Sequence, residues 1–156
     1  MKIIYIALLC SALMSITASA QNISADKVPA SVIKSFKAKF PSAENVKWEL
    51  ENKNEYEAVF KTKGVEQSAS FEMNGKWMET ETEMKISELS AEIQKSVTKN
   101  YAGYKIDEAS KVESAQHGNC YEVKVEKAKE SFEVMMKSKG EIISKKSEKE
   151  DKEDKD

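Results

Sequence analysis

The stretch VPASVIKSFKAKF at residues 28–40 returns in altered form as LSAEIQKSVTKNY at residues 89–101. Apolar residues recur every fourth position in both stretches, at Val28, Val32, Phe36 and Phe40 and at Leu89, Ile93, Val97 and Tyr101. This spacing is typical of an α-helix with one apolar face. Each residue of the second set lies 61 positions after its counterpart, which predicts that one helix-containing unit is used twice.

Both predicted helices are followed by segments in which apolar and polar residues alternate. These segments are residues 46–51, 56–61, 65–73 and 76–84 after the first helix, and 104–114, 121–127, 131–137 and 141–145 after the second. Alternation with a period of two is typical of antiparallel strands with one covered face. Asn74-Gly75 is a strong hairpin signal, and Gly140 follows Gly75 by 65 positions.

The sequence therefore predicts an α+β fold of two tandem repeats, each a helix followed by antiparallel strands. The first repeat is expected to span residues 21–85, beginning with a polar lead-in at residues 21–27, and the second to span residues 86–146. A repeat of about 60 residues buries a smaller fraction of its surface than a larger domain and would be only marginally stable alone. We therefore expect a single continuous antiparallel sheet that both repeats share, with the helices on one face.

The two ends of the chain have compositions that do not fit a folded core. Residues 1–20 combine Lys2, an apolar run at residues 3–16 and Ala18-Ser19-Ala20, which predicts a secretory signal cleaved between Ala20 and Gln21. A lipoprotein would need Cys10 as the lipidated residue, but Leu9 stands where a small residue is expected. Residues 147–156 are all Lys, Ser, Glu or Asp, so a disordered charged tail is expected. A periplasmic or secreted location follows.

The charge pattern narrows the class of partner. The chain has 25 basic and 27 acidic residues, for a net charge of −2, and none of the basic residues is Arg. Arg is the residue best suited to bidentate phosphate and base contacts, so nucleic-acid binding is not expected. No transmembrane segment is predicted, and a monomer is expected. Cys120 alone remains after cleavage, which leaves a Cys120-linked dimer open.

A set of short motifs resembles the PepSY-like family of small periplasmic proteins. The motifs are Val28-Pro29-Ala30, Phe40-Pro41, Asn45-Val46-Lys47-Trp48, Tyr56-Glu57-Ala58 and Asn74-Gly75-Lys76-Trp77. The tandem architecture is similar to the beta-lactamase inhibitor protein (BLIP) fold, over about residues 25–146. The resemblance implies two helix-plus-four-strand repeats in one sheet and no catalytic residues. The second copy departs from it at Ser90, where the helix proline is expected, and at Ile142, which stands in place of Trp77.

Candidate metal ligands are few. His117 and Cys120 lie three positions apart and could supply two ligands, but zinc sites use three or four. Glu79, Glu81 and Glu83 alternate along one predicted strand. Residues two apart on a strand are separated by about 6–7 Å, whereas calcium prefers oxygens that converge from a loop. We therefore predict no metal, no cofactor and no catalytic set.

The polar face of the predicted sheet is the expected binding surface. Its residues would be Glu55, Glu57, Lys61, Glu66, Ser68, Ser70, Glu72, Glu122, Lys124, Glu133 and Lys137. Cys120 is expected in phase with Glu122 and Lys124, where it would be either an exposed thiol or a partly covered small hydrophobe. Trp48 is assigned to the core. Trp77 is in phase with Glu79, so it could anchor a partner, as Trp often does at interfaces, or cap the core.

We therefore expect an exported, non-enzymatic module that binds or inhibits an unknown protein partner in the envelope. The candidate partner-binding residues are Trp77, Met78, Glu57, Ser70, Glu122 and Lys124. The alternative is an extracytoplasmic sensor or accessory domain that binds a small ligand or cation. An enzyme is not predicted, because no acid–base or nucleophile set is visible in the sequence.

Overall fold

The computed structural model describes residues 21–148, in two successive helix-plus-strand parts. The first part contains β1 (Gln21–Ile23), the short 3₁₀ helix η1 (Ala25–Lys27), α1 (Ala30–Lys39), β2 (Glu44–Asn52), β3 (Glu55–Thr62), β4 (Val65–Glu72) and β5 (Trp77–Glu83). The second part contains the 3₁₀ helix η2 (Ile86–Glu88), α2 (Ala91–Asn100), β6 (Lys105–Ser114), β7 (Gly118–Lys127), β8 (Glu130–Met136) and β9 (Ile142–Glu148). The predicted leader at residues 1–20 lies outside the described residues.

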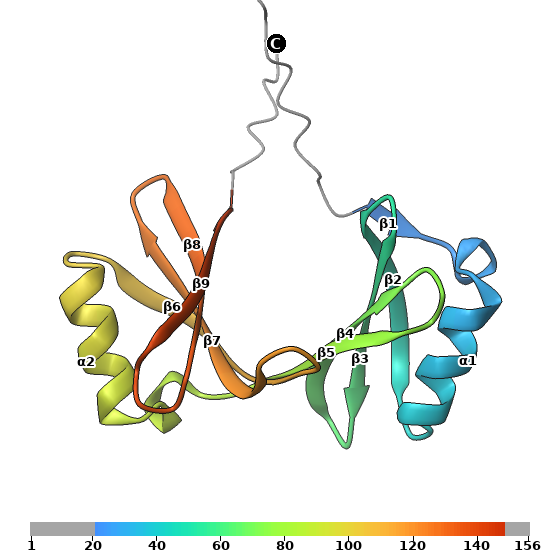
Figure 1. Cartoon of the computed structure of the whole chain (residues 1–156), viewed down its shortest axis with the longest axis horizontal. Helices are drawn as coiled ribbons and strands as arrows, with labels where there is room; N and C mark the ends of the chain where they lie inside the picture. Colours follow the sequence, from blue (N-terminus) through green and yellow to red (C-terminus); the bar gives the residue numbers. More distant parts are fainter. Residues whose placement is uncertain (1–20, 149–156) are drawn as a thin grey trace, which may run out of the picture.

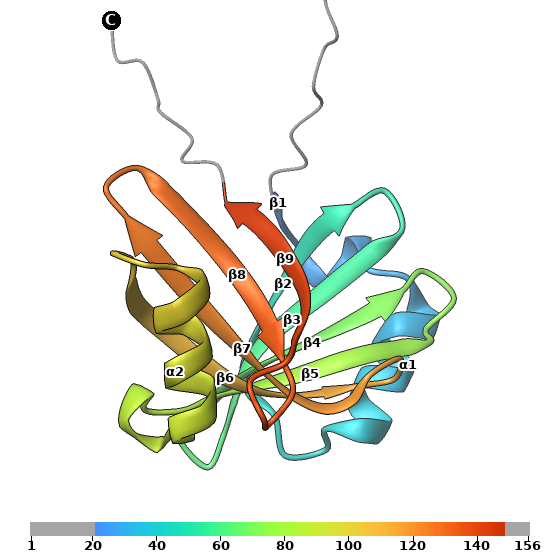
Figure 2. The same cartoon turned by 60° about the vertical axis from the view of Figure 1, so that its left-hand side comes forward.

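The described strands form one antiparallel sheet of nine strands in sequence order, which confirms the predicted single sheet. The two parts are joined through β5 and β6, whose pairing runs from Glu79 opposite Ser114 to Glu83 opposite Ser110. Figure 1 shows that the sheet is strongly bent at this junction, with α1 and α2 at opposite outer ends. Turned by 60°, Figure 2 shows the strands of the two parts facing one another across the bend.

Two boundaries differ from the sequence prediction. Residues 21–23 were expected to belong to a polar lead-in, but they form β1, which pairs with β2 and places Ile23 against the first core cluster. The reason is tertiary, because a strand of three residues gains its stability only from the partner it adds to. The charged tail was expected from residue 147, but β9 continues to Glu148. The remainder of that predicted tail, residues 149–156, lies outside the described residues.

Each part has its own buried core beneath its helix. In the first part the buried residues are Val28, Val32, Phe36, Trp48, Tyr56, Ala58, Phe60, Ala69 and Phe71. In the second part they are Leu89, Ile93, Val97, Tyr101, Ala109, Val123, Val125, Val134 and Met136. The fourfold spacing of the helices and the twofold spacing of the strands therefore both mark core residues. Trp48 is buried, as predicted.

The same close contact between a hairpin and a helix occurs in both parts. Gly75 has a φ of +88° and Gly140 a φ of +80°. A Cβ atom built on Gly75 would lie 2.6 Å from the backbone oxygen of Ser31, and one built on Gly140 would lie 2.6 Å from that of Glu92. The glycines are 65 positions apart and the two oxygens belong to residues 61 positions apart, which are the two offsets that predicted a repeated unit.

Candidate functional site

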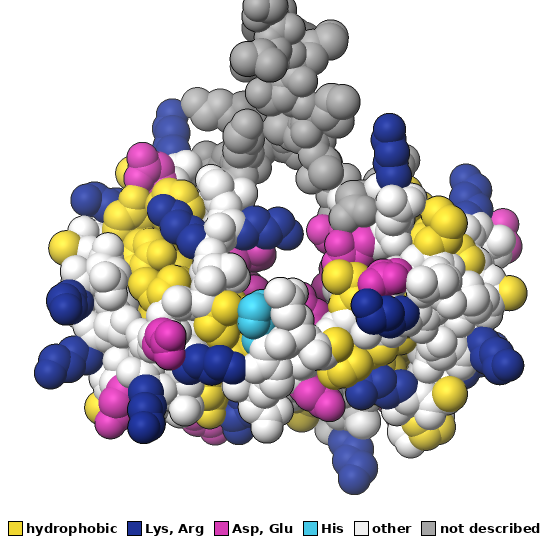
Figure 3. All heavy atoms as spheres, in the orientation of Figure 1, with side chains coloured by type: hydrophobic (Ala, Val, Ile, Leu, Met, Phe, Trp, Pro, Cys, Tyr) yellow, Lys and Arg dark blue, Asp and Glu magenta, His cyan; other side chains and the backbone are white. Residues whose placement is uncertain are grey.

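The side of the sheet opposite the two core clusters forms the wall of the bend, and we call it the inner face. Cross-strand pairing places Glu57, Ser70, Glu79 and Ser114 in one row across it. A second row runs from Glu108 through Lys124 and Glu133 to Lys146. Glu49 and Glu51 on β2, Glu81 on β5 and Glu122 on β7 share this side. Figure 3 shows acidic side chains on both walls of the space between the two parts.

The carboxylates of the inner face crowd together. Oxygen atoms of Glu49, Glu51 and Glu57 lie within 4.8 Å of one another. Burial, reinforced by the charges of Glu122 and neighbouring glutamates, raises the pKa of Glu81 from its usual 4.5 to about 9. Burial also raises the pKa of Glu57 and of Glu122 to about 7 each, and nearby carboxylates act in the same direction. Several of these side chains are therefore protonated near neutral pH.

Lys146 links the two ends of the sheet across the inner face. Its Nζ atom lies 3.7 Å from a carboxylate oxygen of Glu133 on the adjacent strand and 3.9 Å from one of Glu51 on β2. Burial alone would lower the pKa of Lys146, but the carboxylates of Glu133 and Glu51 outweigh it and raise that pKa. One lysine side chain therefore reaches acidic groups of both parts, which shows how narrow the bend is.

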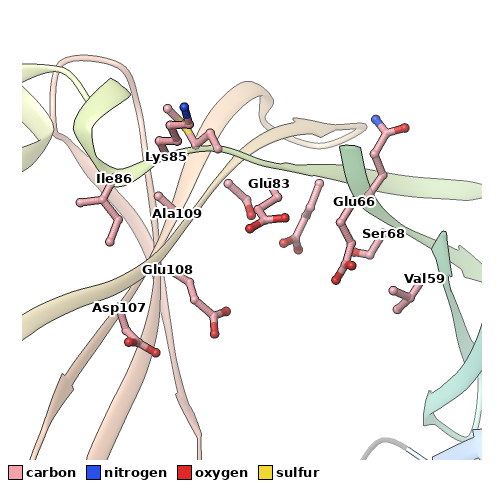
Figure 4. A pocket seen from close by; sticks show the side chains of 13 residues that line it. Val59, Glu66, Ser68, Glu83, Lys85, Ile86, Asp107, Glu108 and Ala109 are labelled. Atoms are coloured by element: carbon pink, nitrogen blue, oxygen red, sulfur yellow. The ribbon is translucent and has the colours of Figure 1, made fainter. Parts of the chain in front are cut away.

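A hollow of about 710 Å³ lies on the inner face beside the β5–β6 junction. Its walls come from both parts of the chain, with Val59, Glu66, Ser68, Glu81 and Glu83 on one side and Asp107, Glu108, Ala109 and Ser110 on the other. Figure 4 shows the side chains of Glu66, Glu83 and Glu108 directed toward this shared space. Such a concave surface, built from two structural units, is where ligands and partners commonly bind.

Four of the six predicted partner-binding residues lie on the inner face: Glu57, Ser70, Glu122 and Lys124. Ser70 is only 7% exposed, and Lys124 Nζ lies 3.7 Å from a carboxylate oxygen of Glu108. The sequence prediction did not include Glu49, Glu51 or Lys146 in the binding face. Glu49 and Glu51 alternate with the buried Trp48 along β2, so the sequence pattern could have placed them on the side opposite the core. The contact of Lys146 with Glu51 depends instead on the bend in the sheet.

Of the two positions that the sequence left open for Trp77, the structure has the one against the core, and Met78 lies at an irregularity beside it. A β-bulge on β5 pairs Ser70 with Glu79 but Phe71 with Trp77, so Met78 is the extra residue. Trp77 consequently leaves the phase of Glu79 and packs against the first core cluster. Its Nε1 atom donates a hydrogen bond to Thr80 Oγ1 at 2.9 Å, and Lys39 Nζ lies 3.8 Å from the centre of the ring system. A bulge breaks strict alternation, so the sequence pattern could not reveal it.

Cys120 shares the strand phase of Glu122 and Lys124, as expected, but it is not exposed. It is 2% accessible and packs with Val112 and Met135 in a small third cluster, against which Ile143 also lies. Of the two positions that the sequence left open for this thiol, the structure has the covered one, because the neighbouring strands supply apolar residues on a side expected to be polar. Burial raises the pKa of the Cys120 thiol, which makes the reactive thiolate scarcer.

We expect Cys120 to react with an aromatic disulfide reagent at least about a hundredfold more slowly in the native protein than in guanidinium chloride, because the thiol must first be exposed by local opening. Absorbance of the released thiolate measures both rates. Non-reducing electrophoresis of the native protein should accordingly show no disulfide-linked dimer. Rapid labelling of the native protein would contradict the burial of Cys120.

The sequence and the fold were compared with known proteins. A family model described as "Putative beta-lactamase-inhibitor-like, PepSY-like" matches residues 14–66 and 54–144. A comparison with curated proteins gives no significant match. None of the helices in residues 21–148 is long and apolar enough to cross a membrane.

Three solved structures with a similar fold come from Bacteroides species. A BLIP-like protein from Bacteroides fragilis has a TM-score of 0.61 and 22% identity, over 80% of this chain and 90% of its own. A DUF2874 family protein from Bacteroides ovatus has a TM-score of 0.64 and 21% identity, over 79% and 91%. A protein from Bacteroides eggerthii described as a "putative periplasmic" protein has a TM-score of 0.63 and 18% identity, over 77% and 88%. At these identities the likeness concerns the fold alone.

Proposed function

The chain belongs to the PepSY-like family of beta-lactamase-inhibitor-like proteins, and from this membership we propose that it is an exported module that binds a protein partner through its inner face. The binding is non-catalytic and inhibitory or regulatory in effect. Export rests on the leader pattern of residues 1–20 and on the periplasmic description of a protein with the same fold. The matched glycine contacts and the matched sequence offsets support an ancestral duplication that placed one helix of each repeat outside the bend.

The observation that carries the proposal is the hollow on the inner face, to which both parts of the chain contribute. Its residues belong to paired strands, so a partner would meet a preorganised surface and little ordering entropy would be lost on binding. A binding role also accounts for the buried carboxylates with raised pKa values, because burying ionisable groups does not by itself favour a stable fold. Trp77 and Met78 lie at the β5 bulge and do not line the hollow. They would contact only a partner that also covers the bulge.

Capture of envelope proteins by the immobilised mature chain tests this function. Ser110→Tyr fills the hollow, whereas Thr98→Tyr places the same side chain at an exposed position on α2. We expect a protein that the wild type and Thr98→Tyr both capture and that Ser110→Tyr loses by at least about tenfold, which corresponds to 1.4 kcal/mol. Equal capture by both variants, or no capture by folded wild-type protein, would refute binding through the inner face.

The second candidate is a sensor or accessory domain that binds a small ligand or cation. It is favoured by the proximity of the Glu49, Glu51 and Glu57 carboxylates, whose oxygens lie within 4.8 Å. A ligand that binds only the folded state raises its stability by mass action. Calcium at millimolar concentration should then raise the melting temperature of the wild type but not that of Glu51→Gln. An unchanged melting temperature would exclude the calcium version.

A further inference from the structure

We infer that the β5–β6 pairing is a hinge between the two parts of the chain, and that two ion pairs on opposite sides of the sheet set the angle at which the hinge rests. The inference goes beyond the proposed function, because it concerns the molecule without a partner. It also bears on that function, since the hinge angle fixes the width of the space that the inner face encloses.

The two parts do not share a packed core. The buried residues under α1 and those under α2 form separate clusters, and among the described residues none belongs to both clusters. The main connection between the parts is the β5–β6 pairing, from Glu79 opposite Ser114 to Glu83 opposite Ser110, with one further backbone hydrogen bond beyond each end. A pair of strands bends more easily than a close-packed core deforms, so motion between the parts is expected at this junction.

Open space lies on both sides of the junction. On the inner face it is the hollow of about 710 Å³. On the outer face, which is the side of the sheet that carries the helices, a second hollow of about 620 Å³ is lined by Lys39 and Phe40 at the end of α1 and by Lys111, Glu113 and Tyr121 of the second part. Figure 1 shows α1 and α2 at opposite outer ends of the bent sheet. The two hollows leave room for the parts to move in either direction.

The inner ion pair resists opening of the bend. Lys146 Nζ on β9 lies 3.9 Å from a carboxylate oxygen of Glu51 on β2, so this pair joins the two parts across the inner face. Lys146 Nζ also lies 3.7 Å from a carboxylate oxygen of Glu133 in its own part, which holds the ammonium group over the face. Acidic side chains on both walls (Figure 3) repel one another and favour opening, which would lengthen the distance between Lys146 and Glu51.

The outer ion pair resists closing of the bend. Lys39 extends from the end of α1 over Trp77, and its Nζ atom lies 3.8 Å from a carboxylate oxygen of Glu113 on β6. Glu113 pairs with Thr80, which is buried and accepts a hydrogen bond from Trp77, so Glu113 lies on the outer face. Closing the bend stretches the outer face and separates Lys39 from Glu113. The two ion pairs therefore act on the same hinge in opposite directions.

Neither ion pair is strong enough to fix the bend. The side chain of Lys146 is 71% exposed and that of Glu113 is 60% exposed, and exposed ion pairs are individually weak and screened by salt. The resting angle is therefore a balance, and loss of one pair shifts it. Each part keeps its own strands paired, so the surface that it contributes to the inner face stays the same and only the distance between the walls varies.

Double electron–electron resonance on the mature protein measures this distance. Spin labels at Lys53→Cys in the β2–β3 turn and Lys129→Cys in the β7–β8 turn occupy exposed positions, one on each part, and brief labelling leaves the buried Cys120 unmodified. We expect Lys146→Gln to lengthen the mean distance between the labels by several ångströms and Glu113→Gln to shorten it, because each substitution removes one of the two opposing ion pairs.

Lys95→Gln and Glu92→Gln are the matched controls, since they remove the same charges from exposed positions on α2. Both controls should leave the mean distance unchanged. Small-angle X-ray scattering of the unlabelled variants gives a second readout, in which Lys146→Gln raises the radius of gyration and Glu113→Gln lowers it. Urea unfolding checks that each variant is folded.

A narrow distance distribution that neither Lys146→Gln nor Glu113→Gln moves would show that the junction is rigid and would overturn the inference. Shifts in the same direction, or a shift with only one of the two variants, would also overturn it, because the ion pairs would then not oppose one another.

The measurement needs no partner, so its outcome is separate from that of the proposed function. If the distances shift as expected while Ser110→Tyr leaves capture of envelope proteins unchanged, the hinge stands and the proposed function fails. If Ser110→Tyr abolishes capture while the distances do not move, the inner face binds its partner as a rigid surface and the hinge is refuted.

Discussion

Replacing Gly75 or Gly140 by alanine is expected to destabilise the protein by about 3–5 kcal/mol, among the largest effects of a single methyl group. At either position the new Cβ atom would lie 2.6 Å from a backbone oxygen of the adjacent helix, that of Ser31 or that of Glu92. Neither the helix backbone nor the hairpin can move without disturbing the core beneath it. The positive φ of both glycines adds about 1 kcal/mol of backbone strain.

Gly64→Ala is the matched control for the steric term. Gly64 has a φ of +82°, close to that of Gly75 and Gly140, but a Cβ atom there would have nothing within 4 Å. Its substitution should therefore cost only the backbone strain, about 1 kcal/mol. Urea unfolding measures all three variants. If Gly75→Ala proved no more destabilising than Gly64→Ala, the close approach of hairpin and helix would not be a determinant of stability.

The stability of the folded protein is expected to fall as pH rises from about 4.5 to about 9 because of Glu57, Glu81 and Glu122. In the unfolded chain each ionises near 4.5, whereas in the fold burial raises the pKa of Glu81 to about 9 and those of the other two to about 7. Over this interval the folded state holds more protons than the unfolded state, so deprotonation favours unfolding. The stabilising contribution is complete below pH 4.5 and lost as pH passes the folded pKa values.

The charged groups that face these carboxylates set the size of the effect. They are Glu49, Glu51, Glu79, Glu133 and Lys146. One pKa unit corresponds to about 1.4 kcal/mol, and because the groups interact, the total is smaller than the sum of separate shifts. Glu81→Gln keeps the shape of the side chain but cannot ionise. At pH 8.5 it should stabilise the protein by about 1–3 kcal/mol.

Thermal unfolding between pH 5 and pH 9 measures this dependence. The wild type should lose melting temperature across the interval, and Glu81→Gln should show a flatter curve that meets the wild type at low pH. Glu141→Gln, at an exposed turn position, should follow the wild type. A wild-type curve that rises with pH, or a Glu81→Gln curve parallel to it, would show that Glu81 is solvated in the fold.

The sequence by itself determined the two helices, the strand segments, the turn glycines and the core beneath each helix. These features are local, because a period of four or of two can be recognised from neighbouring residues alone. Val32 and Ile93 mark the buried side of their helices, and Ala58 and Val123 that of their strands. The family resemblance extended this to a single antiparallel sheet, which the structure has.

Only the tertiary structure decided which polar residues form the candidate site. The bend between β5 and β6 brings Lys146 to Glu51, which is 95 positions away in the chain. No local sequence pattern indicates this contact. A bulge decided that Trp77 packs against the core, and apolar neighbours on adjacent strands buried Cys120. The physical reason is common to all three. Sheet curvature, register shifts and cross-strand packing depend on residues distant in sequence, whereas alternation along one strand reports only which side each residue faces.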